Sequence, residues 1–196
     1  KNNLFKAPET YMEKISANVD EKNIIDLDYS VKKNIHNLSD YLNKKPEELT
    51  ACLLDRPRHR ILINELNKLK VKIKLIKDGD VSGALLVTDE KHNVDIFLGI
   101  GGGPEGVLAA AALDTYECTF QGRFLFDSEN DKIRAKQMGI KDLKKKYNLN
   151  EIISGDSIFC ATGITSGDLL NGIEIKDKNF ISETLVTHKS SKLKKI

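Results

Sequence analysis

Apolar positions along the chain follow two different periods. A spacing of three or four residues is typical of helices with one buried face, and Ser30 is a suitable cap for the first such segment. The helices predicted from spacing or composition are 28–43, 58–70, 104–116 and 128–147, the last interrupted by Gly139. Short apolar runs between turn residues predict strands. These are 50–54, 71–76, 94–100 and 120–126, followed by strand-like pieces in 157–170, 172–176 and 181–187.

The order of these elements predicts the fold class. Strands that alternate with helices form an α/β fold, and we expect a mixed, largely parallel sheet with helices on both faces. One such unit is expected to cover residues 1–196, because this length is within the usual domain size of about 100–200 residues. No apolar run approaches the roughly 18 residues of a membrane-spanning helix, so we expect no membrane partner.

Charge and cysteine content narrow the class of protein. The 31 basic and 29 acidic residues give a formal charge of +2, which is too close to neutral for a dedicated nucleic-acid binder. Cys52, Cys118 and Cys160 are widely spaced without a C-x-x-C pair, so they predict neither a disulfide framework nor a zinc site. We interpret them as buried thiols of a cytoplasmic protein. The sequence leaves homo-oligomerisation open.

Three polar loops each follow a predicted strand. They are "LDRPRHR", "DGD" and "GGGPEG". Sites on sheets of this class gather at the carboxyl ends of the strands. We therefore expect the three loops to line one edge of the sheet.

The first two loops each allow two interpretations. The guanidinium groups of Arg56, Arg58 and Arg60 are suited to converge on phosphate oxygens. Alternatively they form an exposed helix start, since runs of charge are usually solvated. The helix dipole disfavours arginine at that position, which speaks for a bound anion. In the same way, residues 78–80 form either an ordinary Asp-Gly turn or a pair of ligands for a hard cation or sugar hydroxyls.

The third loop has the pattern of a nucleotide-binding turn but carries a carboxylate. Gly101, Gly103 and Gly106 satisfy G-x-G-x-x-G between a predicted strand and helix, and Asp127 follows at the distance of the acidic residue in that fingerprint. Glu105 would repel a pyrophosphate at this helix N-terminus. Glu105 either favours the helix dipole as part of the cap or holds a divalent cation that bridges to a phosphate on the glycine amides.

Longer motifs resemble a known family. "APETYMEKI", "LLDRPRH", "DGDV", "GIGGGPEGVLAAAAL" and "FCATGITSGDLLNGI" are similar, in order and separation, to motifs of the class II fructose-1,6-bisphosphatases. The resemblance covers nearly the whole chain but only the C-terminal portion of that family. It implies a sugar-phosphatase-like fold. It also implies that the family's N-terminal metal-binding region is absent from these 196 residues.

The resemblance also implies roles for individual residues. Those implied to bind substrate are Tyr11, Arg56, Pro57, Arg58, Asp78, Gly79, Asp80 and Gly102. Among them, the tyrosine and the arginines would contact the sugar phosphate, residues 78–80 would hold hydroxyl groups, and the glycine would bind through its backbone. Glu105 would be a ligand of Mg²⁺ or Mn²⁺. The resemblance assigns no catalytic side chain to this chain.

The function implied is metal-dependent hydrolysis of the 1-phosphate of fructose 1,6-bisphosphate, which yields fructose 6-phosphate and phosphate in gluconeogenesis. We expect this activity only as part of a longer chain, with a small sugar bisphosphate as the partner molecule. Two alternatives remain at this point. The chain is an inactive fragment or sugar-phosphate-binding module, or it is a dinucleotide-binding domain.

Overall fold

The main sheet is mixed and places the first strand of the chain at its centre. The computed structural model describes residues 3–195, and within them six strands pair in the order β3-β2-β4-β1-β5-β6. Their bounds are β1 (Tyr11–Ala17), β2 (Thr50–Leu54), β3 (Lys72–Ile76), β4 (Ile96–Gly102), β5 (Thr119–Leu125) and β6 (Lys146–Asn148). Strand β2 runs parallel to β3 and β4, whereas β1 is antiparallel to β4 and β5, and β6 is antiparallel to β5. The mixed α/β sheet is confirmed, with a smaller parallel part than expected.

Strand β1 is not among the strands that the apolar pattern predicts, although it is the strand that makes the sheet mixed. Its sequence, YMEKISA, puts polar residues on both sides of the pleat. Met12 and Lys14 lie on one side with Ser16, while Ile15 and Ala17 lie on the other. All five side chains are buried, because neighbouring strands and helices cover both faces of β1. The alternation of polar and apolar residues along the strand does not predict this burial.

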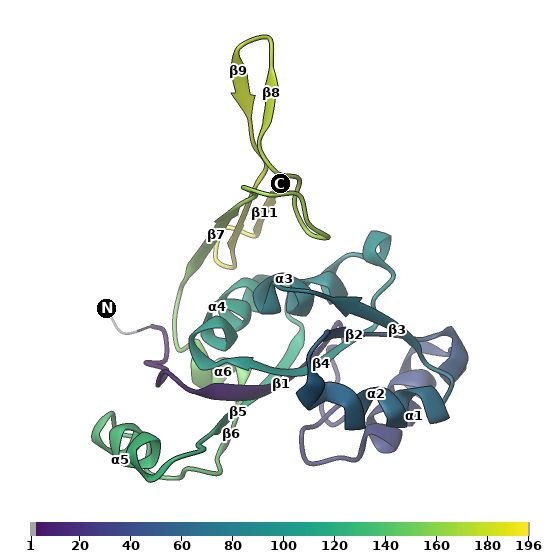
Figure 1. The fold of residues 1–196 in the computed structure, drawn as a ribbon, viewed down its shortest axis with the longest axis vertical. Helices are drawn as coiled ribbons and strands as arrows, with labels where there is room; N and C mark the ends of the chain where they lie inside the picture. The colour runs from purple at the N-terminus through teal and green to yellow at the C-terminus, as the bar shows by residue number, and fades with distance from the viewer. Residues whose placement is uncertain (1–2, 196) are drawn as a thin grey trace.

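Helices cover both faces of the main sheet, as predicted (Figure 1). Helices α1 (Val31–Leu42) and α2 (Arg60–Lys68) bury their apolar side chains in one core cluster, and α3 (Asp80–Leu85) and α4 (Gly103–Leu113) pack in a second cluster. The predicted cap of the first helix is confirmed, because the Ser30 side chain accepts a hydrogen bond from the backbone N–H of Lys33. Short 3-10 turns join these elements at Pro46–Glu48, Pro57–His59, Leu86–Thr88, Glu90–His92 and Asp114–Tyr116.

The polar segment after β5 is helical only in its first half. Helix α5 (Glu129–Gln137) ends before Gly139, which adopts a left-handed backbone with φ of +94°. The chain then continues through β6 into the short helix α6 (Leu149–Ile152). The interruption predicted at Gly139 is therefore the end of the helix.

The C-terminal part forms two further small sheets beside the main body (Figure 1). Within residues 3–195, β7 (Ile158–Thr162), β10 (Thr184–His188) and β11 (Leu193–Lys195) make a three-stranded sheet, and β8 (Glu174–Lys176) and β9 (Asn179–Ile181) make a hairpin. Cys160 on β7 is exposed, which corrects the expectation of three buried thiols, while Cys52 and Cys118 are buried in the body. None of the helices described in residues 3–195 is both long and apolar enough to cross a membrane.

Candidate substrate and metal site

The three polar loops meet at one edge of the main sheet, as predicted from their positions after strands. An ion pair between Arg56 and Asp78, with 2.5 Å between Nη2 and Oδ1, joins the loop after β2 to the loop after β3. The Nε–H of Arg58 donates a hydrogen bond of 2.8 Å to the carbonyl oxygen of Ile100, which joins the first loop to β4. These contacts bring side chains from three separate segments to the carboxyl ends of the parallel strands.

Strand β1 adds Tyr11 to this edge because it runs antiparallel to β4. Its first residue, Tyr11, pairs with Gly102 at the last position of β4. The Arg58 guanidinium carbon lies 4.9 Å from the centroid of the Tyr11 ring, a distance suited to a cation–π contact. The predicted residues Tyr11, Arg58 and Gly102 are thus neighbours, although they are far apart in the sequence.

A buried ion pair lies beneath these residues. The ammonium of Lys14 on β1 contacts Oδ2 of Asp80, the first residue of α3, and the two side chains are 0% and 9% exposed. Among the described residues, the other carboxylate oxygen of Asp80, Oδ1, is buried and has no hydrogen-bond partner. Asp80 was a candidate from its motif. The sequence gives no signal for Lys14, because its role depends on β1 being a central strand.

The electrostatic setting of Lys14 couples it to the rest of the site. Burial is the largest influence and lowers the pKa of the Lys14 ammonium. The carboxylate of Glu105 opposes this shift, and the guanidinium of Arg58 adds to it. Lys14 therefore lies in the field of both the proposed metal ligand and a proposed phosphate-binding arginine.

The buried side chain of His59 holds the loop after β2 in place. Its ring is fully buried, with Nδ1 2.7 Å from the carbonyl oxygen of Leu54, while Nε2 accepts a hydrogen bond of 2.8 Å from the backbone N–H of Ile100. Since Nε2 accepts, Nδ1 carries the hydrogen and donates to Leu54. Burial lowers the pKa of His59, which favours this neutral form. A neutral histidine thus ties the end of β2 to the end of β4.

Two glycines are required by the local geometry. Gly79 has φ of +93°, a left-handed conformation that favours glycine and turns the chain from β3 into α3. Gly101 faces the Asp80 side chain so closely that an added Cβ would overlap the carboxylate. The turn and the close approach together hold Asp80 against β4.

The remaining predicted residues lie on the outer rim of the site. Asp78 is 88% exposed, and Pro57 is exposed at the start of a 3-10 turn. Glu105 is exposed in the first turn of α4, directly after Pro104, with its carboxylate against the backbone of Gly102. A carboxylate at this position is favoured by the helix dipole.

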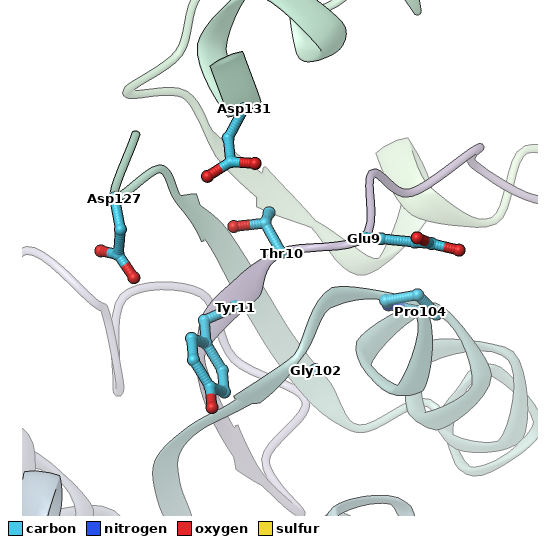
Figure 2. Close-up of a pocket in the computed structure, with 7 residues that line it drawn as sticks. All are labelled: Glu9, Thr10, Tyr11, Gly102, Pro104, Asp127 and Asp131. Carbon is cyan, nitrogen blue, oxygen red and sulfur yellow. The ribbon is translucent and has the colours of Figure 1, made fainter. Parts of the chain in front are cut away.

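A hollow of about 390 Å³ adjoins the site without containing most of it. Tyr11 and Gly102 line it, together with Pro104 and the acidic residues Asp127 and Asp131 (Figure 2). The arginines, residues 78–80 and Glu105 are not among its lining residues. The predicted site is therefore an open sheet edge, and the hollow lies on its β5 side.

The donor atoms fit part of a metal site. Carboxylate oxygens are the ligands that Mg²⁺ and Mn²⁺ prefer, and Mg²⁺ is often held by one or two carboxylates and substrate phosphates. Glu105 offers such a carboxylate at the rim. Within residues 3–195, however, no three His, Cys, Asp or Glu side chains come together in a cluster that could hold a metal. Glu105 can therefore supply one ligand of a metal site, and residues 3–195 do not supply the others.

The strand order argues against the dinucleotide-binding alternative. In that fold, the strand before the glycine-rich turn and the strand carrying the acidic residue are neighbours. Here β1 lies between β4 and β5, so Asp127 follows a strand that does not pair with β4. The match of Gly101, Gly103 and Gly106 to G-x-G-x-x-G is therefore not accompanied by the required topology.

Comparison with known proteins agrees with the motifs. Residues 1–196 match the family described as bacterial fructose-1,6-bisphosphatase, glpX-encoded. The chain is 36% identical over 205 residues to the D-fructose 1,6-bisphosphatase class 2/sedoheptulose 1,7-bisphosphatase of Trichodesmium erythraeum, covering 98% of this chain and 59% of the relative. It is 37% identical over 204 residues to the protein of that name from Synechocystis, covering 97% of this chain and 59% of the relative. The chain thus spans about three fifths of the length of these relatives, and it belongs to the glpX-encoded family of bacterial fructose-1,6-bisphosphatases.

Proposed function

We propose that this chain forms the sugar-phosphate-binding part of a metal-dependent phosphatase that removes the 1-phosphate of fructose 1,6-bisphosphate. The observation that carries the proposal is the convergence of Tyr11, Arg58 and Asp80 with Glu105 on one sheet edge. This edge combines positive charge for a phosphate with carboxylates for hydroxyl groups and a cation. Relatives that match the chain carry this activity in their names.

Each group has a distinct part in the proposed reaction. Arg56 and Arg58 bind phosphate oxygens, since Arg58 is exposed and Arg56 is partly exposed. Oδ1 of Asp80 accepts a hydrogen bond from a sugar hydroxyl, which satisfies an oxygen that lacks a protein partner. Tyr11 packs against the guanidinium of Arg58 and orients it.

Glu105 holds the metal in this proposal. A divalent cation held there, Mg²⁺ or Mn²⁺, would supply polarisation of the phosphate and a lower pKa of the attacking water. At the start of α4 the N–H of Gly103 already donates to the carbonyl oxygen of Thr10 and Pro104 has no N–H, so the N–H of Glu105 is the first that this helix can offer to a phosphate oxygen. The carboxylate of Glu105 would repel a phosphate bound at the helix N-terminus, and a cation held by Glu105 would offset this repulsion.

A second candidate is that residues 1–196 bind sugar phosphate without hydrolysing it. The observation that favours it is the lack of a three-ligand metal cluster within residues 3–195. Release of phosphate by the full-length protein and by residues 1–196 distinguishes the two. We expect the shorter chain to be at least about 1000-fold slower, because metal activation and positioning are lost together. Equal rates would contradict the view that the site is completed from outside this chain.

The test of the proposed function is Glu105→Gln in the full-length protein, assayed for phosphate release from fructose 1,6-bisphosphate with and without divalent cation. The variant keeps the size of the side chain but loses its charge, so we expect metal affinity and turnover each to fall by about 100-fold or more. Glu129→Gln is the matched control, since Glu129 is an exposed glutamate in the first turn of α5. Normal metal-dependent turnover in Glu105→Gln would refute the assignment. Full activity of the unmodified protein after a chelator has removed its divalent cations would refute it as well.

A further inference from the structure

The hairpin of β8 and β9 presents large apolar side chains to solvent. It projects from the C-terminal part, away from the main sheet (Figure 1). Every residue of both strands is exposed, and the exposed fractions of Ile175 and Phe180 are 73% and 76%. An isolated two-stranded hairpin is only marginally stable in water, so such an element gains stability from a covering partner. Side chains of this size are also typical of contact surfaces.

The register of the hairpin sorts its side chains onto two faces. Ile175 pairs with Phe180 across the strands, so both project from one face and form an apolar pair. Glu174 and Lys176 flank Ile175 on β8 and therefore project from the opposite face. One face is apolar at its centre, while the other carries one negative and one positive charge on the same strand.

The charge order on β8 is self-complementary. Within residues 3–195 the hairpin is a sheet of two strands, so β8 has a second edge that no described strand pairs with. If two copies of β8 pair antiparallel about a two-fold axis at Ile175, Glu174 of each copy lies opposite Lys176 of the other. The symmetric arrangement forms this ion pair twice and places Ile175 opposite itself. Strand β9, with the sequence NFI, carries no charge that would specify such a register.

We propose that the β8–β9 hairpin is a contact between two copies of this chain, in which β8 pairs antiparallel with β8 of the second copy. The contact extends the hairpin to four strands and gathers Ile175 and Phe180 of both copies into one apolar patch. It also covers two exposed strand edges, which otherwise pair without specificity. The proposal concerns assembly and does not depend on the proposed phosphatase activity.

The first experiment measures self-association of the full-length protein by sedimentation equilibrium. Phe180→Asp places a charge in the apolar patch, and we expect the dissociation constant of the contact to rise by about tenfold or more. Ile61→Asp is the matched control, because Ile61 is 74% exposed on α2 and lies outside the hairpin. A wild-type protein that is monomeric at all concentrations would overturn the proposal. Unchanged association in Phe180→Asp would also overturn it, because the copies would then associate through another surface.

The second experiment tests the register by exchanging charges. Glu174→Lys alone places lysine opposite lysine, and Lys176→Glu alone places glutamate opposite glutamate, so each variant should self-associate about tenfold more weakly. Mixed together, the two variants should form a one-to-one heterodimer, because every opposing pair is then of opposite charge. The double variant Glu174→Lys/Lys176→Glu should associate with itself as the wild type does. Failure of both the mixture and the double variant to restore association would refute the antiparallel β8 pairing.

Discussion

The candidate site has two halves that differ in how firmly the protein holds them. The inner half consists of Lys14, His59 and Asp80, whose side chains are buried or nearly so. Lys14 pairs with Asp80, and His59 contacts backbone atoms of β2 and β4. The outer half consists of Arg56 and Asp78, which form an exposed ion pair, together with the exposed Glu105. Asp78 and Asp80 are only two residues apart, yet one is 88% exposed and the other is paired with a buried lysine. The same residue type therefore serves as a rigid support in one half and as an adaptable group in the other.

This difference has a physical consequence for binding. Groups that are held in place before the substrate arrives lose little conformational freedom when they bind it, whereas exposed side chains must be ordered. The inner half is therefore ordered before the substrate arrives, and a sugar hydroxyl reaches the buried Oδ1 of Asp80 once a local movement uncovers it. The outer half can follow a phosphate or a metal as these enter or leave the open edge.

The largest expected effect is the loss of the buried cation. Lys14→Met leaves the Asp80 carboxylate buried beside an apolar side chain, and we expect the free energy of unfolding to fall by about 3–5 kcal/mol. Urea denaturation at neutral pH measures this change. The double variant Lys14→Met/Asp80→Asn removes both charges and should recover part of the loss. A change below about 0.5 kcal/mol in the single variant would show that the inner pair is as solvated as a surface pair.

An intermediate effect is expected for adding a methyl group at two adjacent glycines. In Gly101→Ala the new Cβ would overlap the Asp80 carboxylate, which cannot move freely because Lys14 holds it, so we expect a loss of about 1–3 kcal/mol. In Gly102→Ala the overlap is with the Glu105 carboxylate, which is exposed and can rotate away. The second change should therefore cost about 0.5 kcal/mol or less. Equal losses in thermal and urea unfolding would contradict the distinction between the halves.

The smallest effect is expected at the rim. Asp78→Asn removes the charge that pairs with Arg56, and because Asp78 is largely exposed we expect stability to change by about 0.5 kcal/mol or less. The small difference should diminish further as ionic strength rises. A loss comparable to that of Lys14→Met, measured under the same conditions, would show that the two halves do not differ.

The sequence predicts the outer half better than the inner half. Arg56, Asp78 and Glu105 belong to short loop motifs whose positions after strands can be recognised from the apolar pattern alone. Their convergence follows from the rule that strand ends share one edge of a parallel sheet. Lys14 could not be recognised, because its partner Asp80 lies 66 residues away and nothing local marks β1 as a central strand.

The fold was predictable where one period dominates a segment. Helix α1 and strand β2 match their predicted ranges closely, because α1 buries one face at helical spacing and β2 is a short apolar run buried on both faces. The second half of 128–147 was predicted as helix on composition, but the left-handed Gly139 ends the helix. The pairing of β7 with β10 and β11 depends on contacts between distant segments, which a local pattern does not contain.

The central position of β1 determines when the main sheet can form during folding. Tyr11 is synthesised before its pairing partners Gly102 and Leu125, so both partners are still missing when β1 leaves the ribosome. Closing such long loops carries an entropic cost before any contact is gained, and proteins rich in distant contacts fold slowly. The buried lysine of β1 stays in water during this interval. The sheet edge that carries the site is therefore completed only after residues 11–125 have all been made.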